Sequence, residues 1–226
     1  MFNSIFAPFL FFLFFQPDVP TNNASLRQLL ATKNISLENR YENKFVSDVF
    51  KDNILLNIAY LSGKITKKDD INWEEIKKPV TYKFTLAPKK TFAFHEDVLP
   101  QYRDSVVKTT NAHFNLLDGF KSDGYLAGDG VCHLASLMYW AAKTARLDAY
   151  APTDHNFAVI PEIPKEFGVS IYSMPGASQL NAMQNLYITN SKKNPMEFAF
   201  DYDAKKLTVS VYEVKENQHP EALILF

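Results

Sequence analysis

The sequence predicts an α+β fold in which N-terminal helices precede a mostly antiparallel sheet packed on a central helix. Apolar residues recur at steps of three and four over residues 42–61 and again over 131–146, the period of an amphipathic helix. Apolar and polar residues alternate over residues 80–86, the period of a strand with one buried face. Residues 196–202 and 207–214 are strand-like and flank a short polar turn, as in a hairpin. Helices and strands are grouped rather than alternating, which favours α+β over α/β.

The first part of the chain predicts a leader. Residues 5–15 (IFAPFLFFLFF) are an apolar run that is too short for a membrane span of about 20 residues, but has the length of the hydrophobic region of a signal peptide. We therefore expect residues 1–20 to be a signal-like segment that leads to export or membrane attachment. Neither a preceding Lys or Arg nor a small-x-small cleavage site is present. An uncleaved anchor and an ordinary buried start remain as alternatives.

The next part is predicted to be helical. Leu26, Leu29 and Leu30 predict a short helix within residues 21–33, and the apolar face of residues 42–61 predicts a longer one that ends at Gly63. A further short element near residues 69–75 ends at Pro79. We therefore divide the chain into the leader, an N-terminal helical region at 21–78 and an α+β domain at 79–226.

Inside the α+β domain, the central helix begins at a Gly-x-Gly-Val-Cys motif. The segment between the first strands and this motif is rich in loops. The remaining expected strands, outside the alternating run and the terminal hairpin, are residues 92–94, 149–151, 157–160 and 169–172.

Composition excludes several classes of protein. The chain has 226 residues, of which 46% are hydrophobic and 22% charged, so it has enough apolar material for a core. Its 24 Lys and Arg against 25 Asp and Glu give a net charge of -1, which argues against a nucleic-acid partner. One cysteine excludes a disulfide framework and a Cys-rich zinc finger. No P-loop or G-x-G-x-x-G occurs, and we expect no cofactor.

The Gly-x-Gly-Val-Cys motif is the strongest candidate for chemistry. Gly128 and Gly130 permit tight turns and close approach of a ligand, and Cys132 would lie in the first turn of the helix. Helix-start amides and the helix dipole stabilise a thiolate and lower its pKa, which makes the sulfur a better nucleophile. The alternative is that Cys132 is a small buried apolar residue.

A nucleophilic cysteine needs a base, and His155 is the candidate. His133 is adjacent to Cys132, so the two side chains point about 100° apart on a helix. A helix bearing Cys followed by a strand bearing His is the arrangement of several thiol hydrolases. Zinc bound by Cys132, His133 and His155 with Asp154 or Asp129 is a competing possibility, although the metal-binding spacings C-x-x-C and H-x-x-x-H are absent.

These residues also carry a resemblance to the VanW family. Residues 128–139 (GDGVCHLASLMY) resemble its Gly-Gly-Gly-Val/Ile-Cys-Gln signature and the Ser/Thr-rich helix that follows, and residues 155–159 (HNFAV) resemble its His-Ser-x-Pro-Val element. The resemblance runs from about residue 80 to 202. The other matching elements are residues 92–96 (FAFHE), 168–172 (GVSIY) and 185–190 (NLYITN).

The chain departs from the family pattern at four places. The first His of the family's His-Pro-His run is absent, and Thr153 or Asp154 stands near its place. Asp129 replaces a glycine, His133 replaces the usual glutamine, and Gly168 stands where the family has an aspartate. The acid that would orient His155 is therefore missing from its usual place, and Asp154 or Asp129 would have to substitute for it.

The resemblance implies a protein of the bacterial cell envelope, exported or membrane-anchored. The family is named for a gene that accompanies vancomycin resistance, and its members are often joined to domains associated with peptidoglycan. It therefore implies peptidoglycan or its stem peptides as partner, with possible membrane contact through the leader. One hypothesis is a cysteine-dependent amide or peptide hydrolase or transpeptidase; the other is a non-catalytic binding or envelope-assembly module that uses the same groove. The catalytic residues would be Cys132, His155 and Asp154, and the binding residues Gly128, Asp129, Gly130, His133, Ser136 and Asn156, with no metal.

Overall fold

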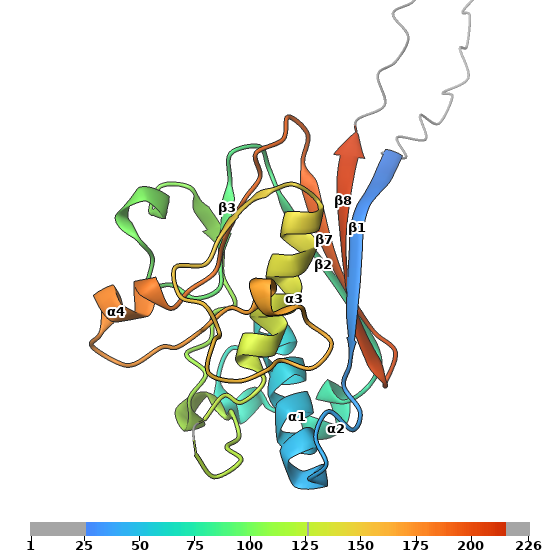
Figure 1. Ribbon diagram of the computed structural model, residues 1–226, viewed down its shortest axis with the longest axis vertical. Helices are drawn as coiled ribbons and strands as arrows, with labels where there is room; N and C mark the ends of the chain where they lie inside the picture. Colours follow the sequence, from blue (N-terminus) through green and yellow to red (C-terminus); the bar gives the residue numbers. More distant parts are fainter. Residues whose placement is uncertain (1–25, 126, 216–226) are drawn as a thin grey trace, which may run out of the picture.

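Two four-stranded sheets flank the central helix α3 in residues 26–125 and 127–215, the parts of the chain that this computed structural model describes (Figure 1). The first sheet has the strand order β1-β8-β7-β2 and is antiparallel throughout. The second has the order β4-β3-β6-β5, in which only β4 runs parallel to its neighbour. The predicted α+β class is confirmed.

The elements have the following bounds. The strands are β1 (Leu26–Ser36), β2 (Val80–Leu86), β3 (Thr91–Ala93), β4 (Val106–Lys108), β5 (Asp148–Tyr150), β6 (Tyr187–Thr189), β7 (Met196–Tyr202) and β8 (Lys206–Lys215). The α-helices are α1 (Lys44–Leu61), α2 (Trp73–Ile76), α3 (Val131–Thr144) and α4 (Ser178–Met183). Short 3-10 helices occur at Lys68–Asp70, Pro100–Tyr102, Leu116–Asp118 and Lys165–Phe167.

Helix α3 packs against the inner face of the first sheet, and α1 continues the helical layer beyond it (Figure 1). Helix α3 contains small residues such as Ala135, Ala141 and Ala142, which are completely buried and allow a close approach of its neighbours. From the sheet, alternate residues of β7 point inward, and the Phe198 ring stacks on Phe84 with centroids 5.2 Å apart. The predicted helices at 42–61 and 131–146, the strand at 80–86 and the terminal hairpin are all present.

The short helix expected within residues 21–33 is wrong where the structure describes it, because residues 26–36 form strand β1. This strand pairs with β8 along its whole length, and Ala31 and Ile35 face the core while Thr32 bonds Ser210 on the outer face. Strand β1 therefore completes the sheet of the C-terminal hairpin, across the division predicted at residue 79. The leader at 1–20 lies outside the described residues. No described helix is sufficiently long and apolar to cross a membrane.

The strands expected at 157–160 and 169–172 are also wrong. Both ranges form loops, and the one isolated bridge near them joins Val169 to Asp154, which precedes the first range. In the second loop, two amides bind side chains of α3 rather than a neighbouring strand: that of Val169 donates to Ser136 Oγ (2.8 Å) and that of Ile171 to Cys132 Sγ (3.4 Å). Both loops therefore belong to the candidate site.

Candidate functional site

The two motif glycines fix the place where α3 begins. Gly128 and Gly130 have φ angles of +87° and +97°, which side-chain-bearing residues rarely adopt. A Cβ on Gly130 would lie 2.6 Å from the carbonyl oxygen of Phe50 in α1, and one on Gly128 would lie 2.7 Å from that of Phe114. Close packing of the motif on other backbone segments is thus the reason for both glycines, although both also line the pocket described below.

A buried amide holds the motif loop against α1. Asn53 Nδ2 donates to the carbonyls of Lys121 and Asp129, both at 2.9 Å, and its Oδ1 accepts from the amide of Lys121. The carboxylate of Asp129 accepts from the amide of Asp123, and burial raises its pKa. Asn53 is not among the residues predicted from the sequence. The only available signal was a polar residue inside the apolar face of the helix at 42–61.

Cys132 lies at the start of α3, as predicted, but its thiol is not activated. The residue is partly exposed, and the sulfur accepts from the amide of Ile171 (3.4 Å) and donates to its carbonyl oxygen (3.6 Å). Burial raises the pKa of the thiol to about 11, with the negative charge of Asp129 acting in the same direction. The expectation that the helix start lowers this pKa is therefore wrong, because loss of hydration outweighs the local amides.

His155 is oriented by a backbone carbonyl rather than by an acid. Its Nδ1 lies 3.0 Å from the carbonyl oxygen of Ala158, so Nδ1 bears the proton and Nε2 the lone pair. Burial lowers the pKa of the imidazole, and the ring of Phe157 covers it with centroids 3.9 Å apart. Asp154 is exposed and does not line the pocket, so the structure does not bring it together with His155 and Cys132. Within the described residues, no hydrogen bond joins Cys132 to His155.

His133 lies in the pocket wall within a buried polar network. Its Nδ1 accepts from the Arg40 guanidinium at 3.2 Å, and its Nε2 lies 3.4 Å from the Tyr41 hydroxyl. Burial, and next the charge of Arg40, hold the pKa of His133 well below its usual value. The guanidinium of Arg40 also donates to the carbonyl of Pro161 (3.1 Å) and contacts Glu162 (3.4 Å). Arg40 therefore links the segment before α1, helix α3 and the loop after His155.

Ser136 and Asn156 were predicted to bind ligand, and the structure places both away from the pocket that contains Cys132. Ser136 is completely buried; it donates to the carbonyl of Cys132 (2.7 Å) and accepts from the amide of Val169 (2.8 Å). It thereby positions the loop that contacts the thiol. Asn156 is exposed and lines a neighbouring cavity of about 350 Å³.

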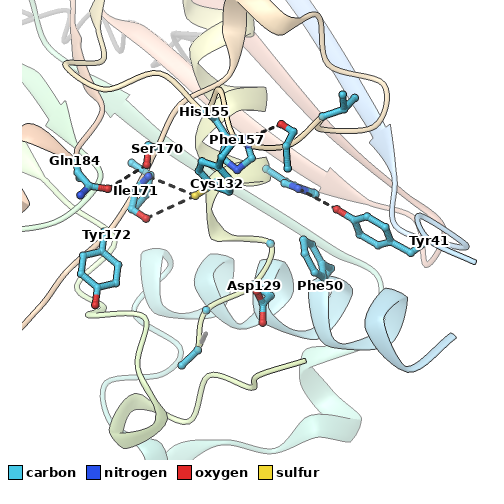
Figure 2. Close-up of a pocket in the computed structure, with 16 residues that line it drawn as sticks. Tyr41, Phe50, Asp129, Cys132, His155, Phe157, Ser170, Ile171, Tyr172 and Gln184 are labelled. Atoms are coloured by element: carbon cyan, nitrogen blue, oxygen red, sulfur yellow. Dashed lines mark hydrogen bonds between the residues drawn. The ribbon is translucent and has the colours of Figure 1, made fainter. Parts of the chain in front are cut away.

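The predicted residues Gly128, Asp129, Gly130, Cys132, His133 and His155 all line one pocket of about 250 Å³. Figure 2 shows Cys132 between Ile171 and His155, with Asp129 and Phe50 toward the other end. The wall residues that sequence reasoning missed are mainly aromatic or carry an uncharged polar group, and they come from separate segments. The aromatic and polar ones are Tyr41, Phe50, Phe157, Ser170, Tyr172 and Gln184; the others are Ala127, Ala158, Val159 and Ile171.

The family is decided by a match that covers most of the pocket. A family model described as "VanW like protein" matches residues 79–212, more than half of the chain. The chain belongs to the VanW-like family. The matched residues include Cys132 and His155. No curated protein and no solved structure gives a significant match.

The VanW-like match does not contain the whole site. Tyr41 and Phe50 precede it and line the pocket, and Arg40 holds His133 from the same segment. Strand β1, also outside the match, pairs with β8 inside it. The segment before residue 79 is therefore part of the structure that forms the VanW-like pocket of this protein.

The side chains considered as zinc ligands do not come together as a metal site in the described part of the chain. No three His, Cys, Asp or Glu side chains gather there in a way that could hold a metal ion. The nitrogens of His133 contact Arg40 and Tyr41, and Nδ1 of His155 contacts a carbonyl. The pocket thus offers apolar surface with a few polar groups, among them the carboxyl group of Asp129.

Proposed function

We propose that this VanW-like protein is a cell-envelope protein that binds a short peptide segment of peptidoglycan in the Cys132 pocket without using Cys132 as a nucleophile. The observation that carries the proposal is the state of the thiol: it is protonated at neutral pH and is bonded to the backbone of Ile171. A protonated thiol is a weak nucleophile. The export or membrane attachment predicted from residues 1–20 would place the pocket beside this ligand.

The lining of the pocket supports a small peptide as ligand. Aromatic side chains such as Phe157 and Tyr172 provide apolar surface, while Ser170 and Gln184 provide a hydroxyl and an amide that match peptide groups. At about 250 Å³ the pocket has room for a small fragment, since drug-sized ligands occupy about 300–1,000 Å³. The family resemblance supports peptidoglycan as the source of that fragment.

Co-sedimentation with peptidoglycan sacculi tests this proposal. We expect the wild type to pellet with sacculi and Phe157→Ala to bind about tenfold more weakly, since an aromatic contact of this kind contributes about 1–2 kcal/mol. Phe157 is 76% exposed, so its removal leaves the core intact. Cys132→Ala is expected to keep the affinity of the wild type.

Val107→Ala is the matched control, because Val107 is also exposed and does not line the pocket. Failure of the wild type to pellet, or equal binding by Phe157→Ala and the wild type, would rule out the proposed binding site. Soluble stem peptide that competes with sacculi would assign the peptide rather than the glycan as the ligand.

A second candidate is a cysteine hydrolase acting on an amide bond of the same ligand. It is favoured by one observation, namely that Cys132 and His155 line the same pocket while Nε2 of His155 carries a lone pair. In such an enzyme His155 would take the thiol proton, the sulfur would attack the amide carbonyl, and the proton would pass to the leaving amine.

Alkylation by iodoacetamide separates the two candidates. With a thiol pKa of about 11, against about 8.5 for free cysteine, Cys132 is expected to react at least tenfold more slowly than free cysteine at pH 7. The rate should still rise above pH 9, where that of free cysteine levels off. The urea-unfolded chain serves as control and should react like free cysteine. A Cys132 that reacts faster than free cysteine, with a plateau below pH 8, would favour the hydrolase.

A further inference from the structure

A second cavity, of about 640 Å³, lies between α4 and the loop that follows β3. Both elements are on the side of the molecule away from β1 and β8 (Figure 1). Its walls combine apolar residues such as Leu99 and Met183 with the charged residues Glu96, Asp97 and Arg103. Pocket lining that is partly apolar and has a few charges of both signs is typical of sites for small polar molecules.

The carboxylate of Asp97 is held in place by buried amides. Asn181, which is only 2% exposed, donates from Nδ2 to Asp97 Oδ2 at 2.7 Å, and Asn185 donates to the Asp97 backbone carbonyl at 2.8 Å. Asn181 is itself fixed by the backbone of Met174 through both ends of its amide. Burial alone would raise the pKa of Asp97, but hydrogen bonds from Asn181 and Ser178 outweigh it and lower the pKa. Asp97 is therefore ionised and rigid.

The opposite charges in this cavity do not neutralise each other. Among the described residues Arg103 forms no ion pair, and Asp97 contacts neutral amide and hydroxyl groups rather than a cation; Glu96 pairs only with His113, at 3.1 Å. A carboxylate has room for about four hydrogen bonds, so Asp97 can still accept more. The same cavity is thus lined by an anchored anion and by a cation that forms no ion pair in the described part of the chain.

We propose that this cavity binds a free α-amino acid with an apolar side chain, its ammonium on Asp97, its carboxylate on Arg103 and its side chain among the apolar residues. The site is separate from the Cys132 pocket and does not depend on the function proposed for it.

Isothermal titration with leucine, N-acetylleucine and leucinamide tests the assignment. Leucine is expected to bind at least tenfold more tightly than either derivative, because each derivative lacks one charge and so loses the charge-assisted hydrogen bonds at that end. Asp97→Asn should abolish the preference for leucine over N-acetylleucine. Arg103→Gln should abolish the preference for leucine over leucinamide. The two variants therefore report on opposite ends of the ligand.

Lys165→Gln is the control, since Lys165 is an exposed cation that lines a different cavity. Thermal unfolding shows whether each variant is folded. If Asp97→Asn does not fold, Arg103→Gln still tests the proposal, because Arg103 is exposed and its replacement leaves the core intact. Absence of saturable leucine binding, or equal affinity for the three compounds, would overturn the assignment. So would unchanged preferences in a folded Arg103→Gln variant.

Discussion

Gly130→Ala is expected to lower the free energy of unfolding by about 2–5 kcal/mol, a large share of the 5–15 kcal/mol that stabilises a typical domain. Two costs add. The φ of +97° costs a side-chain-bearing residue about 1–2 kcal/mol. The new Cβ would also lie 2.6 Å from the carbonyl oxygen and 3.1 Å from the Cα of Phe50, and forced overpacking costs about 1–3 kcal/mol. Both atoms are backbone atoms of α1, which cannot rotate away. Urea unfolding followed by circular dichroism measures the loss.

Gly63→Ala is the matched control. Gly63 also has a positive φ, +75°, but a Cβ there would meet nothing within 4 Å. Gly63→Ala should therefore lower the free energy of unfolding only by the cost of the positive φ, about 1–2 kcal/mol. If the two variants lose the same stability, the contact between the motif and α1 does not explain Gly130, and the ligand-approach explanation of this glycine regains support.

Elements with a strong local period were predictable from the sequence. The repeated apolar face of α1 and α3 and the alternation in β2 depend on nearby residues only. Strand β1 was not predictable in this way, because Leu26, Leu29 and Leu30 have helical spacing. Its partner β8 is more than 150 residues away, and the pairing Leu26 to Lys215 decides the conformation. Local spacing cannot report such a contact.

In the site, too, local features were predictable from the sequence and those that depend on distant contacts were not. The motif around Cys132 and the position of His155 were visible in the sequence, and both residues do line one pocket. The raised pKa of the thiol was not visible, because it depends on the loop at Ile171 that encloses the sulfur. Tyr41 and Phe50 were missed because they precede the motif by about 80 residues and reach the pocket only through the packing of α1 on α3.

Acidification from pH 6.5 toward pH 5 is expected to destabilise the folded protein strongly. His95, His133 and His155 are buried, and burial lowers the pKa of all three. In the unfolded chain each would take up a proton near pH 6.5, whereas the folded chain excludes it until lower pH. The unfolded state then binds more protons, so stability falls as pH falls. Each excluded proton contributes at most about 1.4 kcal/mol per pH unit, and only between the folded and the unfolded pKa of its group. The contribution therefore extends furthest for His133, whose pKa lies well below its usual value.

His133→Gln isolates the largest of these contributions. Glutamine keeps an acceptor for Arg40 and a donor for Tyr41 but does not titrate, so the slope of stability against pH below 6.5 should fall by about 1.4 kcal/mol per pH unit. His113→Gln is the control. Burial lowers the pKa of His113, but Glu96 and Asp118 outweigh burial and raise it, so its stabilising effect is present below pH 6.5 and is lost only as pH rises. The His113 variant should therefore keep the acid slope of the wild type. Urea unfolding at intervals between pH 7.5 and 5 measures the slope of stability against pH for the wild type and for both variants. A wild-type stability that stays level over this range would show that His133 is not held neutral by Arg40 and its surroundings.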